Sequence, residues 1–532
     1  MKVEDAQSQE ESFLKGAILL SMAAIIAKLL SAAYRIPYQN LAGDLGFYVY
    51  QQIYPFYGLV VTLAMYGFPV VISRQMTEYR SRGQEEKGKQ FLAISLFSLS
   101  LFSVCTTLFM FFGAPWLAQL MGDSHLTEPI RAISFVFLLL PLISVGRGIT
   151  QSEQNMVPTA LSQVSEQFIR VIGILLFAFL LIQLGYGPYG AGIGAAFGSL
   201  AGSFVAGIIL LLSIRKVKVR TYFTAKRMTS YQFFSYTFRF FKQSLFICMG
   251  ALTFIWFQFV DVFSMIPLLN QYGLSSNEAF YIKALYDRGQ PILQMGTIIT
   301  TTFALALVPL LTNARMLKEH SRVRFYQGLT WRLTILIAGA ATIGLWVIIE
   351  PLNAMLFMDR AGSEVIKIYM LSVFVGAIYM TGAAILQGHG YVHIPAIAVF
   401  VGVGAKLSFN LLLIPIYGSS GAAWSTVLAL VVMACSVLYG IYKLNNGFLG
   451  RLRPYRWLFL SLVTMLVATS VWQSFLSTKL EPTRIHDTIL TLTTVTIGII
   501  TMVLMIWILP IFNAKEWSAI PVLNKWNVKN KK

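Results

Sequence analysis

The sequence predicts an all-α polytopic membrane protein with about fourteen transmembrane helices. Of its 532 residues, 56% are hydrophobic and only 12% are charged, whereas a soluble protein carries roughly 25% charged residues. Apolar stretches of about 20 residues recur along the chain, and that length crosses a bilayer as a helix. Lysine and arginine lie mainly in the short segments between these stretches. This distribution explains the net charge of +19 by membrane topology and argues against nucleic-acid binding.

Each apolar stretch is taken in order as one candidate span. The first is too long for the core of a signal peptide, and we expect it to be an uncleaved transmembrane helix. The predicted spans run approximately over residues 13–36, 48–72, 90–112, 129–150, 157–184, 190–213, 243–266, 283–312, 329–350, 364–387, 393–415, 420–442, 457–475 and 488–511.

The charges of the loops predict the orientation. With a cytoplasmic N-terminus, the inside loops are rich in Lys and Arg, as is the C-terminal tail, and two outside loops contain neither residue. An even number of spans then places both termini in the cytoplasm of a bacterial cell, with the chain in the cytoplasmic membrane. The basic loops are 73–90, 214–242, 313–332 and 443–456, and the loops without Lys or Arg are 113–128 and 267–282.

Two segments resemble each other and predict an internal repeat. The sequence from Tyr186 to Ala191 opens the sixth span, and a similar sequence from Tyr417 to Ala422 opens the twelfth. Related six-helix halves that enclose a central cavity are a common transporter plan. We therefore expect an N-lobe (1–213), a basic cytoplasmic linker (214–242), a C-lobe (243–442), and two extra spans with a basic tail (443–532). Glycines recur every four residues in the sixth span and predict a close helix contact: Gly190, Gly194, Gly198 and Gly202.

Basic residues within the spans are the first candidates for a functional site, because a charge at mid-membrane costs about 2.5–3.5 kcal/mol on insertion scales. At ~1.5 Å per residue, Lys28 and Lys406 lie about 20 Å deep and Arg170 about 18 Å deep. Lys28 and Lys406 have no acid within a helical turn, so we expect both to line a cavity. Arg35, nearer the outer surface, either joins them or anchors the helix at the interface.

Acidic residues in the spans are candidate partners or coupling sites. Glu166 lies four residues before Arg170 and can pair with it on one helix face. Asp261 either binds a coupling cation or pairs with Arg288. Arg147 has the position of an ordinary topology charge.

The segment LYDRGQPILQM, from Leu285 to Met295, opens an apolar span with an adjacent acid and base. Asp287 and Arg288 are neighbours, so their side chains face different directions. Pro291 lacks an N–H group and frees the carbonyl of Asp287, and we expect a bend here. The bent tip would carry Arg288 as an anion-binding residue or as a plain interface anchor.

Other motifs do not support catalysis. Residues 83–90 fit most of a phosphate-binding loop but lack the Ser or Thr after the lysine and follow no strand. The three cysteines fall in apolar segments, and His389 and His393 have no acidic or thiol partner nearby. We expect no enzyme activity, no metal and no cofactor. A cavity with excess positive charge instead favours an anionic lipid or lipid-linked phosphate, with the membrane potential or a monovalent cation as the driving force.

The chain also resembles the polysaccharide-transporter branch of the MOP exporter superfamily, which includes the stage V sporulation protein B type and the MurJ-like lipid II flippases. The resemblance rests on residues 15–57, the QSEQNMVPTALSQVSEQFIRV and ILQGHGYVHIPAIA segments, and LYDRGQPILQM with the span that follows. It implies fourteen spans, two lobes that alternate in access, and transport of undecaprenyl-pyrophosphate-linked sugars. It also implies cavity cations at Lys28, Arg35 and Arg288.

Three functional hypotheses follow. The first is a flippase for a lipid-linked oligosaccharide, with lipid II as the leading substrate. The second is a cation-coupled multidrug exporter of the MATE type, which the predominance of deep basic residues disfavours. The third is a non-transporting scaffold for wall synthesis, which leaves Lys28 and Lys406 unexplained. We expect a monomer in the bilayer, with cell-wall synthesis enzymes as candidate partners.

Overall fold

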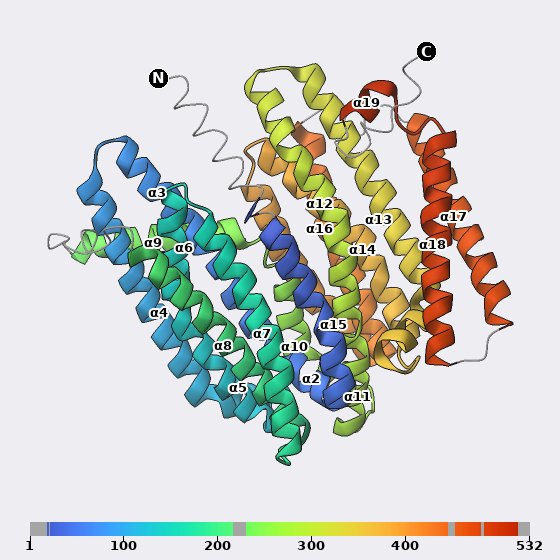
Figure 1. Cartoon of the computed structure of the whole chain (residues 1–532), viewed down its shortest axis with the longest axis horizontal. Helices are drawn as coiled ribbons and strands as arrows, with labels where there is room; N and C mark the ends of the chain where they lie inside the picture. The colour runs from blue at the N-terminus through green and yellow to red at the C-terminus, as the bar shows by residue number, and fades with distance from the viewer. Residues whose placement is uncertain (1–18, 21, 216–229, 445–452, 480–482, 520–532) are drawn as a thin grey trace. The chain divides into compact units, whose positions relative to one another are not determined.

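The computed structural model describes residues 19–20, 22–215, 230–444, 453–479 and 483–519, and all regular elements in these ranges are helical (Figure 1). Twelve of the described helices are long and apolar enough to cross a membrane. One of them, Met22–Ser81, covers both the first and second predicted spans. The eighth predicted span overlaps α12 (Gly289–Met316), part of whose side chains lie outside the described residues. Every predicted span overlaps a helix, and the all-α membrane class is confirmed.

Packing divides the chain into two compact units, residues 1–287 and 288–532. The predicted lobes (1–213 and 243–442) and the appended segment (443–532) stay predictions. Much of the predicted basic linker, residues 216–229, lies outside the described residues, as do 445–452 and the tail from 520.

The first unit is a bundle of mostly long helices. Its elements are α2 (Arg35–Thr62), η1 (Leu63–Gly67), α3 (Phe68–Ser81), α4 (Glu85–Leu120), η2 (Ser124–Leu126), α5 (Thr127–Ser134), η3 (Phe135–Leu139), α6 (Leu140–Ser152), α7 (Val157–Gln183), α8 (Gly187–Arg215), α9 (Ser230–Cys248), α10 (Thr253–Gln271) and α11 (Ser276–Asp287).

A glycine separates the first two spans. Gly43 interrupts the helical backbone of α2 with φ of 68° and ψ of −179°. A residue with a side chain rarely adopts this positive φ, whereas glycine does so at little cost. The chain can therefore change direction here without a long loop, and Arg35 lies about two helical turns before this point.

The glycine stripe of the sixth predicted span packs against α7. A Cβ atom placed on Gly198 would lie 2.2 Å from the backbone nitrogen of Ile174, and one on Gly194 would lie 2.6 Å from the carbonyl carbon of Phe177. The predicted close approach is thus confirmed for this part of the stripe, because no side chain would fit between the two backbones. This contact fixes α7, the helix that carries Glu166 and Arg170.

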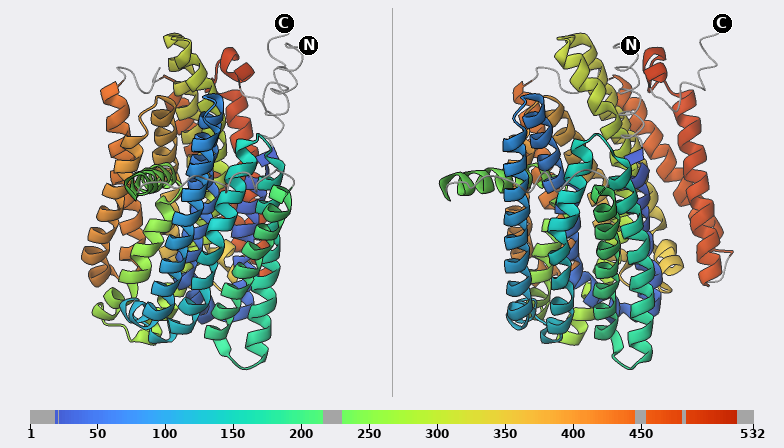
Figure 2. Two further views of the ribbon diagram at one scale, coloured as in Figure 1. Left: turned by 90° about the vertical axis from the view of Figure 1, so that its left-hand side faces the viewer. Right: turned by 60° about the vertical axis from the view of Figure 1, so that its left-hand side comes forward.

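The seventh span begins later than predicted. The sequence predicts it at 243–266, but α10 starts at Thr253, and α9 is a separate helix that lies across the direction of its neighbours (Figure 2). Phe240 of α9 stacks against Phe68 with ring centroids 5.3 Å apart, while Arg239 and Lys242 remain exposed. The apolar face of α9 packs on the bundle, and its other face carries the bases. Composition alone could not separate this amphipathic helix from the span that follows.

The second unit contains α12, α13 (His320–Phe357), α14 (Ser363–Gly388), α15 (His393–Tyr417), α16 (Ser419–Leu444), α17 (Arg453–Ser477), α18 (Arg484–Ile508) and α19 (Ala514–Ala519). Within it, α15 and α16 repeat the α7–α8 arrangement: a Cβ atom on Gly421 would lie 2.3 Å from the carbonyl oxygen of Leu413. The tight junction also needs Gly418, whose φ is 57°. These local features agree with the predicted internal repeat.

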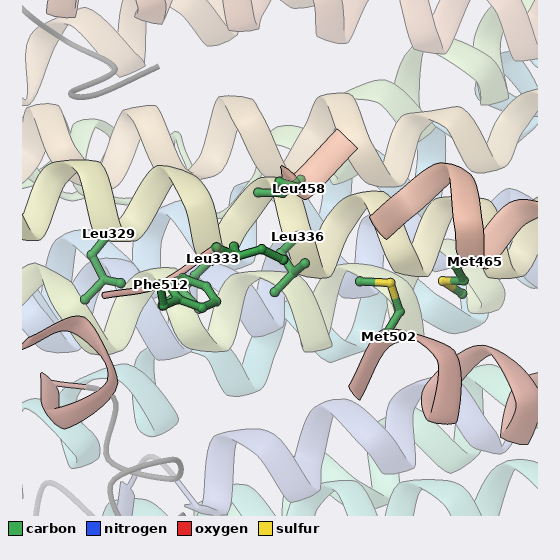
Figure 3. Packing of buried hydrophobic residues seen from close by; sticks show 8 residues of the cluster. Leu329, Leu333, Leu336, Leu458, Met465, Met502 and Phe512 are labelled. Carbon is green, nitrogen blue, oxygen red and sulfur yellow. The ribbon is translucent and has the colours of Figure 1, made fainter. Parts of the chain in front are cut away.

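An apolar core attaches the last helices to α13. Figure 3 shows its side chains, which come from α13, α17, α18 and the segment before α19. Next to this core, Arg332 of α13 forms an ion pair with Glu516 of α19, and one of its hydrogen bonds measures 2.9 Å. The cluster comprises Leu329, Leu333, Leu336, Leu458, Met465, Met502, Ile511 and Phe512.

Candidate functional site

Two arginines of the first unit lie among tyrosines, and we call this group the arginine–tyrosine cluster. Arg170 donates hydrogen bonds to the Gln167 side chain at 2.8 Å and to the Tyr34 hydroxyl at 2.6 Å. Arg35 lies over the ring of Tyr54, with its guanidinium carbon 4.1 Å from the ring centroid. The cluster comprises Arg35, Arg170, Tyr34, Tyr50, Tyr54 and Tyr57.

The helices bring these residues together from three sequence positions. Arg35 and Tyr34 lie at the start of α2, while Tyr50, Tyr54 and Tyr57 follow at intervals of four and three on the same helix, beyond the Gly43 turn. Intervals of three and four place side chains on one helix face. Arg170 comes from α7, where its guanidinium lies 4.8 Å from the Tyr34 ring centroid and 4.4 Å from that of Tyr57. The faces of the rings attract both cations.

The cluster holds uncompensated positive charge. Arg35 and Arg170 are each 1% exposed, and neither forms an ion pair within the part of the chain that the structure describes. Three of their nitrogens, Nε and Nη2 of Arg35 and Nε of Arg170, have no hydrogen-bond partner among the described residues. Buried N–H groups without a partner are costly, particularly on charged groups. The arrangement can accept an anion with several oxygens, which would satisfy these donors.

Glu166 is engaged elsewhere, so the predicted Glu166–Arg170 pair is wrong. Its carboxylate accepts a hydrogen bond of 2.8 Å from Arg147, and the pair is almost completely buried. Arg147 also donates to the Ser162 hydroxyl at 3.2 Å, and Ser203 donates to Glu166 at 3.2 Å. The sequence suggested that Arg147 is an ordinary topology charge, and this prediction is wrong because Arg147 is buried in an ion pair. Its contact with α7 neutralises Glu166 and leaves Arg170 to the tyrosines.

The two other candidate acids of the first unit, Asp287 and Asp261, also have partners. Asp287 forms an ion pair of 2.7 Å with Lys283, four residues earlier on α11, and Asp261 of α10 accepts a hydrogen bond of 2.9 Å from the Tyr286 hydroxyl. Gln51 of α2 donates to the backbone carbonyl of Asp287 at 3.5 Å. These bonds hold the end of α11 against α2 and α10. Whether Asp261 or Asp287 also binds a coupling cation stays a prediction.

Arg288 lies at the predicted interruption of the helix. One helix ends at Asp287 and the next begins at Gly289, with Pro291 in its first turn. Arg288 is 0% exposed, so it is not an anchor in lipid or water. Both of its terminal nitrogens donate to Asp359, with an Nη1–Oδ1 distance of 2.7 Å and an Nη2–Oδ2 distance of 3.0 Å.

Asp359 lies in the loop between α13 and α14, outside the membrane-spanning helices. Partial burial opposes ionisation of its carboxyl group, but the hydrogen bonds from Arg288 and the Ala361 N–H, together with the charge of Arg288, outweigh burial and lower its pKa. Asp359 is therefore a carboxylate at neutral pH and forms a true ion pair with Arg288.

The two lysines differ from the arginines. Lys406 of α15 is 0% exposed, and its ammonium donates to the Thr426 hydroxyl at 2.8 Å and the Ala422 carbonyl at 3.1 Å, both on α16. Lys28, in helical residues 22–33, is only partly buried. The depth predicted for Lys406 agrees with its burial. A substrate contact by either lysine stays a prediction.

Sequence reasoning missed Asp359 and the tyrosines. Asp359 is 71 residues from Arg288, and no periodicity links a loop residue to a helix end. The tyrosines did give a signal, because Tyr50, Tyr54 and Tyr57 share one face of a predicted span. Within the described residues, no group of three or more His, Cys, Asp or Glu side chains could hold a metal ion.

A membrane bundle of this kind, with buried basic residues in both of its units, is typical of a multi-pass membrane transporter. The chain belongs to the polysaccharide biosynthesis protein family, whose model matches residues 13–315. The predicted superfamily is thereby confirmed.

Curated relatives extend over most of the chain. The "Uncharacterized membrane protein YabM" of Bacillus subtilis (strain 168) is 39% identical over 80% of this chain and 79% of its own length. The "Lipid II flippase MurJ" of the same organism is 24% identical over 86% of each chain. Its "Stage V sporulation protein B" is 26% identical over 80% of this chain and 82% of its own.

Solved structures agree on the fold. An inward closed conformation of lipid II flippase MurJ has a TM-score of 0.69 at 15% identity and covers 92% of this chain and 98% of its own. An inward-facing multidrug resistance MATE family transporter has a TM-score of 0.64 at 17% identity, covering 80% of this chain and 98% of its own. At these identities the likeness shows the fold alone.

Proposed function

We propose that this transporter is a flippase that moves an undecaprenyl-pyrophosphate-linked sugar from the inner to the outer leaflet by alternating access, with the peptidoglycan precursor lipid II as the leading substrate. The arginine–tyrosine cluster carries this proposal. Its two buried guanidinium groups have donors without partners and no carboxylate to neutralise them among the described residues. A diphosphate offers several oxygens and more than one negative charge, and both match these donors.

One named relative supports the same substrate class. The lipid II flippase of Bacillus subtilis (strain 168) matches 86% of this chain. The positive-inside rule supports cytoplasmic termini. An inside-negative potential would then favour outward movement of an anionic head group by about 2.3 kcal/mol per charge per 100 mV. We expect a monomer without enzymatic activity or a cofactor. The membrane potential or a monovalent cation would drive transport.

The structural likeness to MATE family transporters makes a multidrug exporter the second candidate. Such an exporter needs a buried acid to attract a cationic drug. In this chain, Glu166 is neutralised by Arg147, and Asp287 by Lys283. Asp261 accepts a hydrogen bond from the Tyr286 hydroxyl. Among the described residues, the arginine–tyrosine cluster brings together two buried cations, Arg35 and Arg170, that form no ion pair, and this favours an anionic substrate.

Complementation tests the proposal. In a strain depleted of its lipid II flippase, the wild-type chain should restore growth, and Arg170→Gln should fail at equal membrane abundance. Arg131→Gln is the matched control, because Arg131 pairs with Glu128 at the surface of the same unit. Full rescue by Arg170→Gln would contradict the role of the cluster. Drug resistance from the wild type without growth rescue would favour the exporter.

A further inference from the structure

We propose that Asp359 is a specificity-determining residue. Its carboxylate binds the guanidinium of Arg288 and is displaced only by a more highly charged anion. This inference rests on the proposed function, since it assumes that Arg288 meets the diphosphate of a lipid-linked sugar. Asp359 would thus act as a competitor that substrate must displace.

The contact has the geometry of anion recognition. Two parallel hydrogen bonds, of 2.7 Å and 3.0 Å, join the two terminal nitrogens of Arg288 to the two oxygens of Asp359. A phosphate group binds the same pair of nitrogens in the same two-pronged way. The face of the Phe357 ring, 5.4 Å away, further fixes the guanidinium. The carboxylate therefore occupies the position that two phosphate oxygens would take.

The two partners differ in exposure. Arg288 is fully buried, whereas the Asp359 side chain is 47% exposed and lies on a loop. Displacement of the carboxylate would thus return it to water at little cost, while the guanidinium stays in place. An ion pair with one partner in water is weaker than a buried pair.

The loop presents Asp359 in a defined position. Oδ1 of Asp359 also accepts the backbone N–H of Ala361 at 2.8 Å, which closes a local turn. The Asn353 side chain donates to the Ala361 carbonyl at 2.8 Å. On the other side, Arg360 binds Asp487 of α18 at 2.5 Å. These bonds hold the carboxylate near Arg288 at a high effective concentration.

Selectivity follows from charge. A tethered carboxylate with one negative charge competes well against other singly charged anions, because its local concentration exceeds theirs. A diphosphate has more charge and more acceptor oxygens, so its attraction to the guanidinium is stronger. Neutral lipids and singly charged head groups would leave the Arg288–Asp359 pair intact. Arg35 and Arg170 have no such internal competitor among the described residues.

The test measures binding of inorganic pyrophosphate and of acetate to the purified full chain in detergent by titration calorimetry. Asp359→Asn removes the charge but keeps an oxygen for the Ala361 N–H. Asp487→Asn is the matched control, since it breaks the neighbouring ion pair of the same loop. If Asp359 holds Arg288 in about nine-tenths of molecules, Asp359→Asn should bind pyrophosphate about tenfold more tightly. Acetate binding should also increase, and Asp487→Asn should match the wild type.

Three results would overturn the inference: unchanged pyrophosphate affinity in Asp359→Asn, an equal gain in Asp487→Asn, or a gain that survives when Arg288→Gln is added. Asp359→Ser, which also keeps an acceptor for the turn, serves if Asp359→Asn does not fold. Failure of the proposed function looks different. Tighter pyrophosphate binding by Asp359→Asn, with no lipid transport by the wild type, would sink the proposed function alone.

Discussion

The buried ion pair of Arg147 and Glu166 offers a sharp quantitative prediction. Both side chains are almost fully buried, at 1% and 2% exposure, and lie 2.8 Å apart. Removal of one partner from a buried pair leaves an uncompensated charge and costs about 3–5 kcal/mol. We expect Glu166→Gln to lower the free energy of unfolding by this amount. The Ser162 and Ala64 acceptors of Arg147 reduce the loss toward the lower end of the range.

Unfolding of the purified protein in mixed micelles, followed by circular dichroism, measures the effect. The double variant Arg147→Met/Glu166→Met should be much less destabilised than Glu166→Gln, because no buried charge remains. The surface pair of Arg131 and Glu128 is the control, and Glu128→Gln should cost about 0.2–1 kcal/mol. A Glu166→Gln loss as small as that of Glu128→Gln would refute the buried neutralisation of Glu166.

Three further predictions concern other parts of the chain. Although burial opposes ionisation of the Asp359 carboxyl group, its pKa is lowered in the folded protein. The ionised carboxylate therefore stabilises the fold above the ordinary pKa of about 3.9, and this stabilisation is lost as the pH falls through the folded pKa. The melting temperature, measured as the pH is lowered, should show this loss in the wild type and not in Asp359→Asn. Gly198→Ala should destabilise by about 1–3 kcal/mol in denaturant unfolding, because its Cβ would lie 2.2 Å from the backbone of α7, whereas Gly404→Ala, with no atom within 4 Å, should be neutral or slightly stabilising. Glu516→Gln should weaken the attachment of α19 to α13 and make the C-terminal segment more sensitive to limited proteolysis, and equal cleavage rates would contradict this role.

Hydrophobic runs of membrane length predicted most of the fold. A transmembrane helix satisfies its own backbone hydrogen bonds, so its presence depends on local composition and is readable from sequence. The start of the seventh span was wrong because α9 is as apolar on one face as the helix that follows it. The bend predicted from Pro291 coincides with the break between α11 and α12, whereas the turn at Gly43 was not predicted.

Site partners were harder to predict, because pairing depends on which helices touch. Glu166 and Arg170 are four residues apart, yet the partner of Glu166 comes from α6, 19 residues earlier. Arg288 finds its carboxylate in a loop beyond the next two long helices, α12 and α13. A single sequence contains the candidates for each pair but not the packing that selects among them. Depth predicted the burial of Arg170 and Lys406, but Lys28 is only partly buried and Arg147, at a predicted helix end, is fully buried.

Under the proposed function, the buried arginines carry a lipid-linked diphosphate across the membrane. Proteoliposomes containing the purified chain and a fluorescent polyprenyl-diphosphate sugar test it directly, with a membrane-impermeant quencher added outside. Wild-type protein should make the inner-leaflet pool accessible to the quencher, and the double variant Arg35→Gln/Arg170→Gln should not. An inner-leaflet pool that stays protected with folded wild-type protein, or equal transport by the double variant, would contradict a role of these arginines in transport.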